Sequence, residues 1–148
     1  MKRVALSVAA LVSAGVLAVT AFALVRHDDS GERCFTQEGE AAIAACTKAI
    51  QSGRFSGADL AGIYDNRAIE HRQQGDFDRA IADYTAAIRI DAEHAGAYAG
   101  RGLAWEGKAD ADKAKADYRK ALALAQKYDD GPWAHDTARG RLQALGAN

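Results

Sequence analysis

Apolar residues recur three and four positions apart over most of the chain, which is the spacing of an amphipathic helix. One such stripe lies in residues 77–88, and similar stripes lie in residues 37–52 and 132–145. No segment shows the strict alternation of a half-buried strand, and the single proline and Ala-rich body disfavour an all-β fold. The first stripe consists of Phe77, Ala80, Ile81, Tyr84, Ala87 and Ile88. The pattern predicts an all-α protein.

The N-terminus carries a different signal. Met1-Lys2-Arg3 is basic, and Val4–Val25 contains no charged residue. Ala21-Phe22-Ala23 has the small-x-small pattern of a signal-peptidase site, which would release a chain starting at Leu24. The same run is also long enough to remain as a membrane anchor, because about 20 apolar residues span the hydrocarbon core. We therefore expect residues 1–25 to be a signal peptide or an anchor, residues 26–35 to be a linker, and the rest to lie across the membrane.

The body repeats itself with a period of 34 residues. Residues 61–94 and 95–128 agree at eleven aligned positions, most of them aromatic or small. The conserved pairs include Tyr64/Tyr98, Arg67/Arg101, Asp76/Asp110, Ala80/Ala114, Asp83/Asp117, Tyr84/Tyr118 and Ala87/Ala121. A repeat of this length predicts stacked helical hairpins.

These positions resemble the tetratricopeptide repeat (TPR) family. In both repeats, aromatic, small and Ala residues stand at the positions where the family has them. There are two departures: His71 replaces an aromatic residue, and the proline that the family has near the end of the repeat is missing. The resemblance implies a TPR domain over residues 36–148, with a half repeat at 36–60, full repeats at 61–94 and 95–128, and a capping helix at 132–145. We also expect an Arg–Asp pair to link the helices of each repeat, and Asp76 and Ser56 to cap helices.

The two cysteines, Cys34 and Cys46, both follow the uncharged run. Disulfides persist in exported proteins, and Cys34 could fold back along the helix that carries Cys46. We predict a structural disulfide; the alternative is a buried thiol at Cys46 and an incidental Cys34. The sequence contains no C-x-x-C motif, so the two cysteines do not indicate redox chemistry.

Composition and motifs argue against several function classes. The formal net charge is −1, with 19 basic and 20 acidic residues, so the chain has no electrostatic attraction for nucleic acid. The four histidines lie apart, and no phosphate-binding loop, metal-ligand spacing or nucleophile elbow is present. We expect no enzyme activity, no cofactor and no metal site.

The resemblance instead implies a concave surface that binds a protein or peptide. Asn66 occupies a position from which family members hold a ligand backbone, but the cationic cluster that clamps a C-terminal carboxylate is missing. Gly96, Ala99, Gly100, Leu103 and Gly107 form a stripe with little side-chain bulk. We interpret the stripe as a close approach to a partner; the alternative is tight packing against the protein's own helices. The predicted concave residues are Asp65, Asn66, Ile69, Arg72, Gln73, Gly96, Ala99, Gly100, Leu103 and Glu106.

We therefore expect an exported interaction module, an adaptor or assembly factor of a bacterial cell envelope. It would be periplasmic, secreted, or anchored to the inner membrane with the TPR domain outside. It would contact the membrane only through the N-terminal segment. The alternative is a structural homo-oligomer that binds no peptide.

Overall fold

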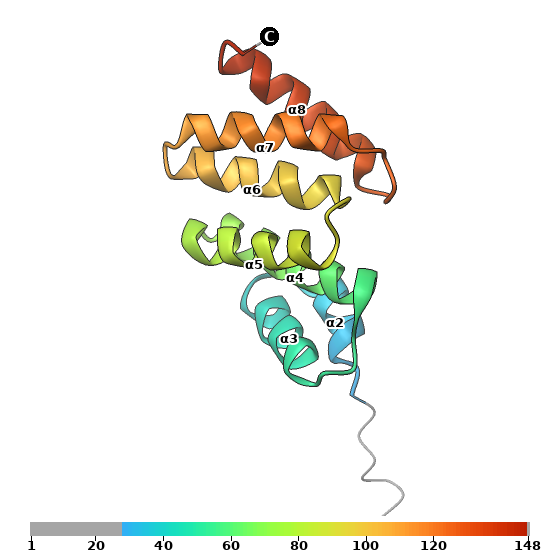
Figure 1. Ribbon diagram of the computed structural model, residues 1–148. Helices are drawn as coiled ribbons and strands as arrows, with labels where there is room; N and C mark the ends of the chain where they lie inside the picture. Colours follow the sequence, from blue (N-terminus) through green and yellow to red (C-terminus); the bar gives the residue numbers. More distant parts are fainter. Residues whose placement is uncertain (1–27, 148) are drawn as a thin grey trace, which may run out of the picture.

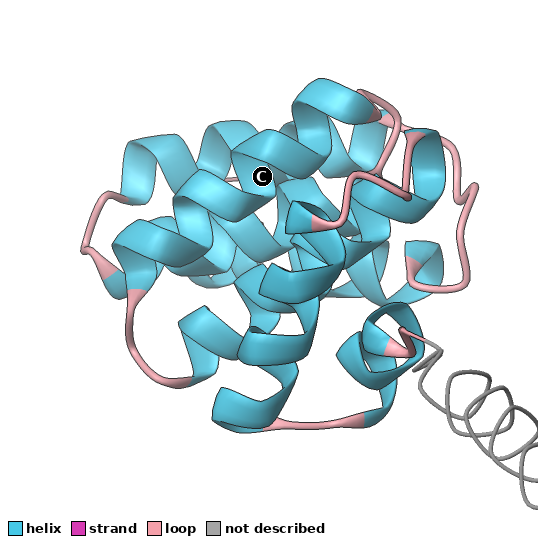
Figure 2. Cartoon of the chain, turned by 90° about the horizontal axis from the view of Figure 1, so that it is seen from below, coloured by secondary structure: helices cyan, strands magenta, loops and turns pink. Residues whose placement is uncertain are grey.

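A computed structural model of the chain describes residues 28–147, which form seven α-helices and no strand. Loops of a few residues connect the helices (Figure 2), and the helices stack in chain order from α2 and α3 to α8 (Figure 1). The predicted all-α repeat fold is confirmed. The helices are α2 (Ser30–Thr36), α3 (Gly39–Gln51), α4 (Gly57–Gln73), α5 (Phe77–Ile90), α6 (Ala95–Gly107), α7 (Ala111–Ala123) and α8 (Gly131–Ala144).

The two full repeats have the same internal contacts. In the α4–α5 hairpin Arg67 donates two hydrogen bonds to Asp83, at 2.8 and 2.7 Å. In the α6–α7 hairpin Arg101 donates to Asp117 at the same two distances. These charged groups are mostly shielded from water, so each pair fixes the two helices of its hairpin. The predicted Arg–Asp pairs are confirmed.

The turns inside the hairpins also correspond. The side chains of Asp76 and Asp110 each accept a hydrogen bond from the backbone amide three residues later, at 3.2 Å, and so cap α5 and α7. The residue before each cap is left-handed, with φ of +80° at Gly75 and +60° at Ala109. Glycine adopts this conformation without strain, so the second turn is less favourable than the first.

The N-terminal unit differs from the prediction. Part of the expected linker at residues 26–35 is helical, because α2 begins at Ser30 and packs against α3 and α4. A disulfide joins Cys34 of α2 to Cys46 of α3, with 4.6 Å between their Cα atoms, and both residues are fully buried. The unit is therefore a helix pair with a short first helix, not a half repeat. Ser56 precedes α4, but its side chain makes no capping hydrogen bond, so that expectation was wrong.

At the other end α7 stops at Ala123, and residues 124–130 cross to α8 without forming a helix. The apolar face of α8 packs against α6 and α7 and buries Ala134, Ala138 and Leu142. The predicted signal peptide or anchor, residues 1–25, lies outside the described residues. Within residues 28–147 no helix combines the length and the apolar character needed to cross a membrane.

Candidate functional site

Three neighbouring pockets form one continuous groove, with volumes of about 870, 440 and 290 Å³. The first two pockets share Phe35 and Tyr128, and the second and third share Asp65 and Asp130. The groove is lined by α2, by the length of α4, by the start of α6, and by the segment that leads into α8. We call the 290 Å³ part the deep pocket; it is lined by Asp65, Ile69, Arg72, Tyr84, Gly96, Asp130 and Trp133.

Two large apolar side chains stand open to solvent in this groove. Phe35 on α2 is 57% exposed and Trp133 at the start of α8 is 45% exposed. Among the described residues the one other exposed large hydrophobic side chain is Ile90, at the end of α5, which does not line the groove. Exposed aromatic residues in a concave site are typical of partner-binding surfaces.

The groove is acidic. Seven acidic residues line it, against two arginines, Arg54 and Arg72. Asp28 is paired with Lys48 and Arg54, whereas Glu32, Asp59 and Asp129 form no ion pair with any residue of the range 28–147. Because the whole chain has a net charge of only −1, the negative charge is concentrated on this surface.

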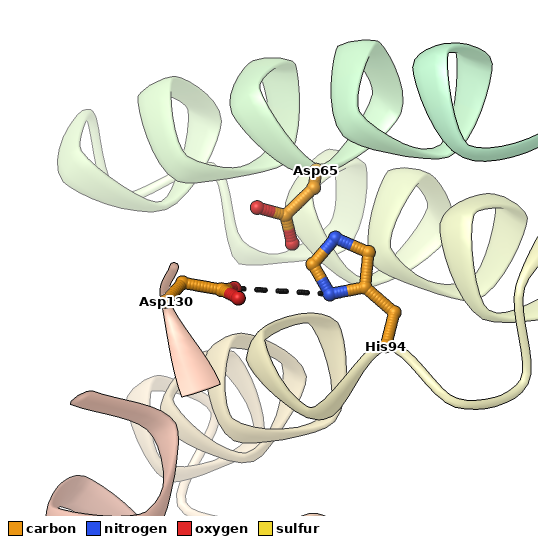
Figure 3. Close-up of side chains that lie close together, drawn as sticks. All are labelled: Asp65, His94 and Asp130. Carbon is orange, nitrogen blue, oxygen red and sulfur yellow. Dashed lines mark ion pairs between the residues drawn. The ribbon is translucent and has the colours of Figure 1, made fainter. Parts of the chain in front are cut away.

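Asp65, His94 and Asp130 meet at the junction of the second and third pockets. The carboxylates of Asp65 and Asp130 both face the imidazole ring, and Nδ1 of His94 lies 3.7 Å from a carboxylate oxygen of Asp130 (Figure 3). Nδ1 also accepts a hydrogen bond from the backbone amide of Ala97, at 3.3 Å. His94 is thus the N-cap of α6, and its Nδ1 presents no proton to Asp130.

Burial and charge perturb these groups. Burial, together with the negative charge of Asp130, raises the pKa of Asp65 to about 7, and Arg72 opposes this shift. Burial lowers the pKa of His94, against the effect of Asp130. Burial and the charge of Asp65 raise the pKa of the Tyr84 hydroxyl above its ordinary value. His94 and Tyr84 are therefore neutral near pH 7. The negative charge of Asp65 and Asp130 is then balanced only in part, by Arg72.

Several buried polar atoms of the deep pocket have no hydrogen-bond partner in the part of the chain that the structure describes. They are one carboxylate oxygen of Asp65, one of Asp130, the hydroxyl of Tyr84 and Nε of Arg72. Tyr84 is only 1% exposed, yet it lines this pocket. Unpaired buried polar groups are rare in folded proteins and mark places where a ligand can complete the hydrogen bonding.

A cation is the natural ligand for this arrangement. Donor atoms of Asp65, His94 and Asp130 lie within 4.8 Å of one another, so these three side chains could also hold a metal ion. No spacing in the sequence indicates this cluster, because the three residues lie on different elements. Arg72 in the same pocket and the apolar walls of Ile69 and Trp133 favour an organic cation over a bare ion.

Four predicted concave residues do line the deep pocket: Asp65, Ile69, Arg72 and Gly96. Asn66 lines the neighbouring pocket, but its amide donates to the backbone carbonyl of Cys34. That bond ties α4 to α2 and uses one N–H of the amide. The predicted contact of Asn66 with a ligand backbone stays a prediction.

The glycine stripe is explained by the protein's own side chains. A Cβ atom on Gly100 would lie 2.5 Å from the ring of Tyr84, and one on Gly107 would lie 2.4 Å from the ring of Phe77. Gly96 similarly makes room for the carboxylate of Asp130. The interpretation of the stripe as a close approach to a partner was therefore wrong, and intramolecular packing accounts for it.

The remaining predicted positions lie outside the groove. Ala99 is fully buried and Leu103 is half-buried in the core beneath α8. Glu106 accepts hydrogen bonds from Arg141 of α8 and from Tyr118. Gln73 is exposed at the end of α4. For the three residues of α6 the cause is α8, which packs against α6.

Comparison with known proteins gives the family. A model described as "TPR repeat" matches residues 70–107, and one described as "Tetratricopeptide repeat" matches residues 95–128. The Arabidopsis OM64 TPR domain has 31% sequence identity and a TM-score of 0.54, and the match covers 68% of this chain and 79% of that one. The chain belongs to the TPR family.

A second similar structure is the second TPR domain of human RPAP3, solved in complex with the HSP70 peptide SGPTIEEVD. It has 25% identity and a TM-score of 0.59, and the match covers 74% of this chain and 82% of that one. Among curated proteins no sequence matches this chain. The repeats and their relatives support a protein–protein interaction module.

Proposed function

We propose that this protein binds an extended segment of a partner protein in the groove and acts as an exported adaptor or assembly factor of a bacterial cell envelope. The observation that carries the proposal is the groove itself: it is continuous over three pockets, it is concave, and Phe35 and Trp133 stand exposed in it. A similar domain, that of RPAP3, holds a peptide, which supports the same use here.

Two features support export. The Cys34–Cys46 disulfide suits an oxidising compartment, where such bonds persist. The basic start and the uncharged run of Val4–Val25 suit a signal peptide or an anchor. Fusing residues 1–27 to a reporter that is active only outside the cytoplasm tests this part. An inactive reporter with normal expression would refute export.

Photocrosslinking in cells tests the binding function. A photoreactive amino acid is placed at Phe35 or at Trp133, and in a matched control at Ile90, which is exposed but away from the groove. We expect another protein to be crosslinked from the two groove positions and not from Ile90. Crosslinks only between copies of this chain would instead indicate the homo-oligomer, and equal labelling from all three positions would refute a groove-specific partner.

A further inference from the structure

Resting on this proposed function, we propose that the groove selects basic segments and that the deep pocket receives one lysine or arginine side chain of the bound segment. The cationic head would lie against the carboxylates of Asp65 and Asp130 and the hydroxyl of Tyr84. The aliphatic stem would lie between Ile69 and Trp133. The proposal names the chemistry of the partner, which the repeat family by itself does not determine.

The hydrogen bonding of the pocket is the first argument. Asp65, Asp130 and Tyr84 each present an oxygen that lacks a partner, and Tyr84 is 1% exposed. Nδ1 of His94 and the nearest oxygen of Asp130, 3.7 Å apart, are both acceptors, because Nδ1 is already bonded to the amide of Ala97. The pocket also holds one unpaired donor, Nε of Arg72, and the hydroxyl of Tyr84 can both donate and accept. The ionised carboxylates of Asp65 and Asp130 only accept, and an ammonium or guanidinium group supplies several donors to them at once.

Charge is the second argument. The two carboxylates approach the same ring from two elements far apart in sequence (Figure 3), and a single arginine, Arg72, shares the deep pocket with them. The rest of the groove adds five further acidic residues. A basic segment is therefore attracted along its whole length, whereas an acidic peptide such as SGPTIEEVD, which the RPAP3 domain holds, is repelled.

The shape of the pocket is the third argument. Its volume of about 290 Å³ is far larger than a metal ion needs. Ile69 and the half-exposed indole of Trp133 form apolar walls beside the carboxylates. Long cationic side chains bury their stems on apolar surface and place their heads on aromatic faces or carboxylates, which matches this combination.

A positional-scanning library of synthetic peptides tests the proposal on the full chain. We expect lysine or arginine to be enriched at one position of the bound peptides above all others, and the affinity to fall at high salt. In the Asp130→Asn and Asp65→Asn variants the selected peptide should bind about tenfold more weakly or worse. Asp136→Asn is the matched control, because it removes the same charge from an exposed site on α8. Circular dichroism checks that each variant is folded.

The outcomes separate this inference from the proposed function. Peptides that bind the groove without a preference for lysine or arginine would overturn the inference and leave the interaction function standing. The same holds if the two variants bind the selected peptide as tightly as the wild type. Stoichiometric Zn²⁺ binding that requires Asp65 and Asp130, with no competition from the peptide, would assign the pocket to a metal instead. If no library peptide binds and no groove crosslink forms, both proposals fail.

Discussion

Replacing Asp65 by asparagine should stabilise the protein at neutral and alkaline pH. In the folded protein the pKa of Asp65 is raised to about 7 from an ordinary value of 3.8, mainly by burial and then by the charge of Asp130. Between these two values the folded state holds more protons than the unfolded state. The contribution of Asp65 to the stability of the wild type therefore falls as the pH rises from about 4 to 7, and the full destabilisation by this residue remains above pH 7.

The size of the effect follows from the shift. One pKa unit corresponds to about 1.4 kcal/mol, so a shift of roughly three units sets a ceiling of about 4 kcal/mol. Because Asp65 keeps some contact with solvent, we expect a gain of about 2–3 kcal/mol for Asp65→Asn at pH 8. At pH 5 most of the destabilisation by ionised Asp65 is absent from the wild type. The stability gained by Asp65→Asn should therefore be clearly smaller at pH 5 than at pH 8.

Urea unfolding of the wild type and of Asp65→Asn at pH 5 and pH 8 gives the gain in stability at each pH. The two gains are then compared. The neighbouring His94 also titrates: its lowered pKa removes stability as the pH falls below about 6.5. It is present in both proteins, so its contribution largely cancels in the comparison. Asp136→Asn serves as the control for a change of net charge. An equal gain in stability at both pH values, or a loss of stability at pH 8, would refute the conclusion that the ionised carboxylate of Asp65 destabilises the folded protein.

Three further predictions concern the scaffold. Cys34→Ser, or reduction of the disulfide, should lower the free energy of unfolding by about 3 kcal/mol, which thermal unfolding with and without reductant will show. Arg101→Met leaves a buried carboxylate without its partner and should cost about 3 kcal/mol in urea unfolding, whereas Arg139→Met, in an exposed pair, should cost less than about 0.5. Gly100→Ala should lower the free energy of unfolding by about 1–3 kcal/mol, because its Cβ meets the ring of Tyr84. Gly140→Ala, where nothing lies nearby, should raise it by up to about 1 kcal/mol. Equal effects of the two substitutions would contradict the packing explanation.

The repeat scaffold could be predicted because its signals lie within single hairpins. The caps at Asp76 and Asp110 and the pairs of Arg67 and Arg101 depend on residues at fixed short separations, which the 34-residue shift exposes directly. The helix over Ser30–Thr36 escaped prediction for the opposite reason. It has seven residues and no apolar stripe of its own, and it buries Cys34 through the disulfide and through contact with the next unit.

Only the side of the candidate site that α4 forms could be predicted from the sequence. Asp65, Ile69 and Arg72 follow from the register of α4, since positions three or four apart share a helix face. Asp130 lies in the connection before α8, which has no periodicity, and Trp133 at the start of α8 lies off the buried face of that helix. No pattern in the sequence therefore places these two residues opposite α4. The glycine stripe was misread because Gly100 fits against Tyr84, and size complementarity between helices cannot be read from one helix alone.

The origin of the groove residues bears on how a repeat protein acquires specificity. The second repeat, residues 95–128, contributes only Gly96 and Tyr128 to the groove, because α8 covers Ala99 and Leu103. The exposed aromatic residues, Phe35 and Trp133, both belong to terminal elements that depart from the repeat. A change in either terminal element would therefore alter which segment is bound while the paired charges inside the hairpins keep the fold. If the proposed function holds, partner choice rests on two sources: first-repeat residues such as Asp65 and Ile69, and Phe35, Asp130 and Trp133, which lie where the repeat pattern ends.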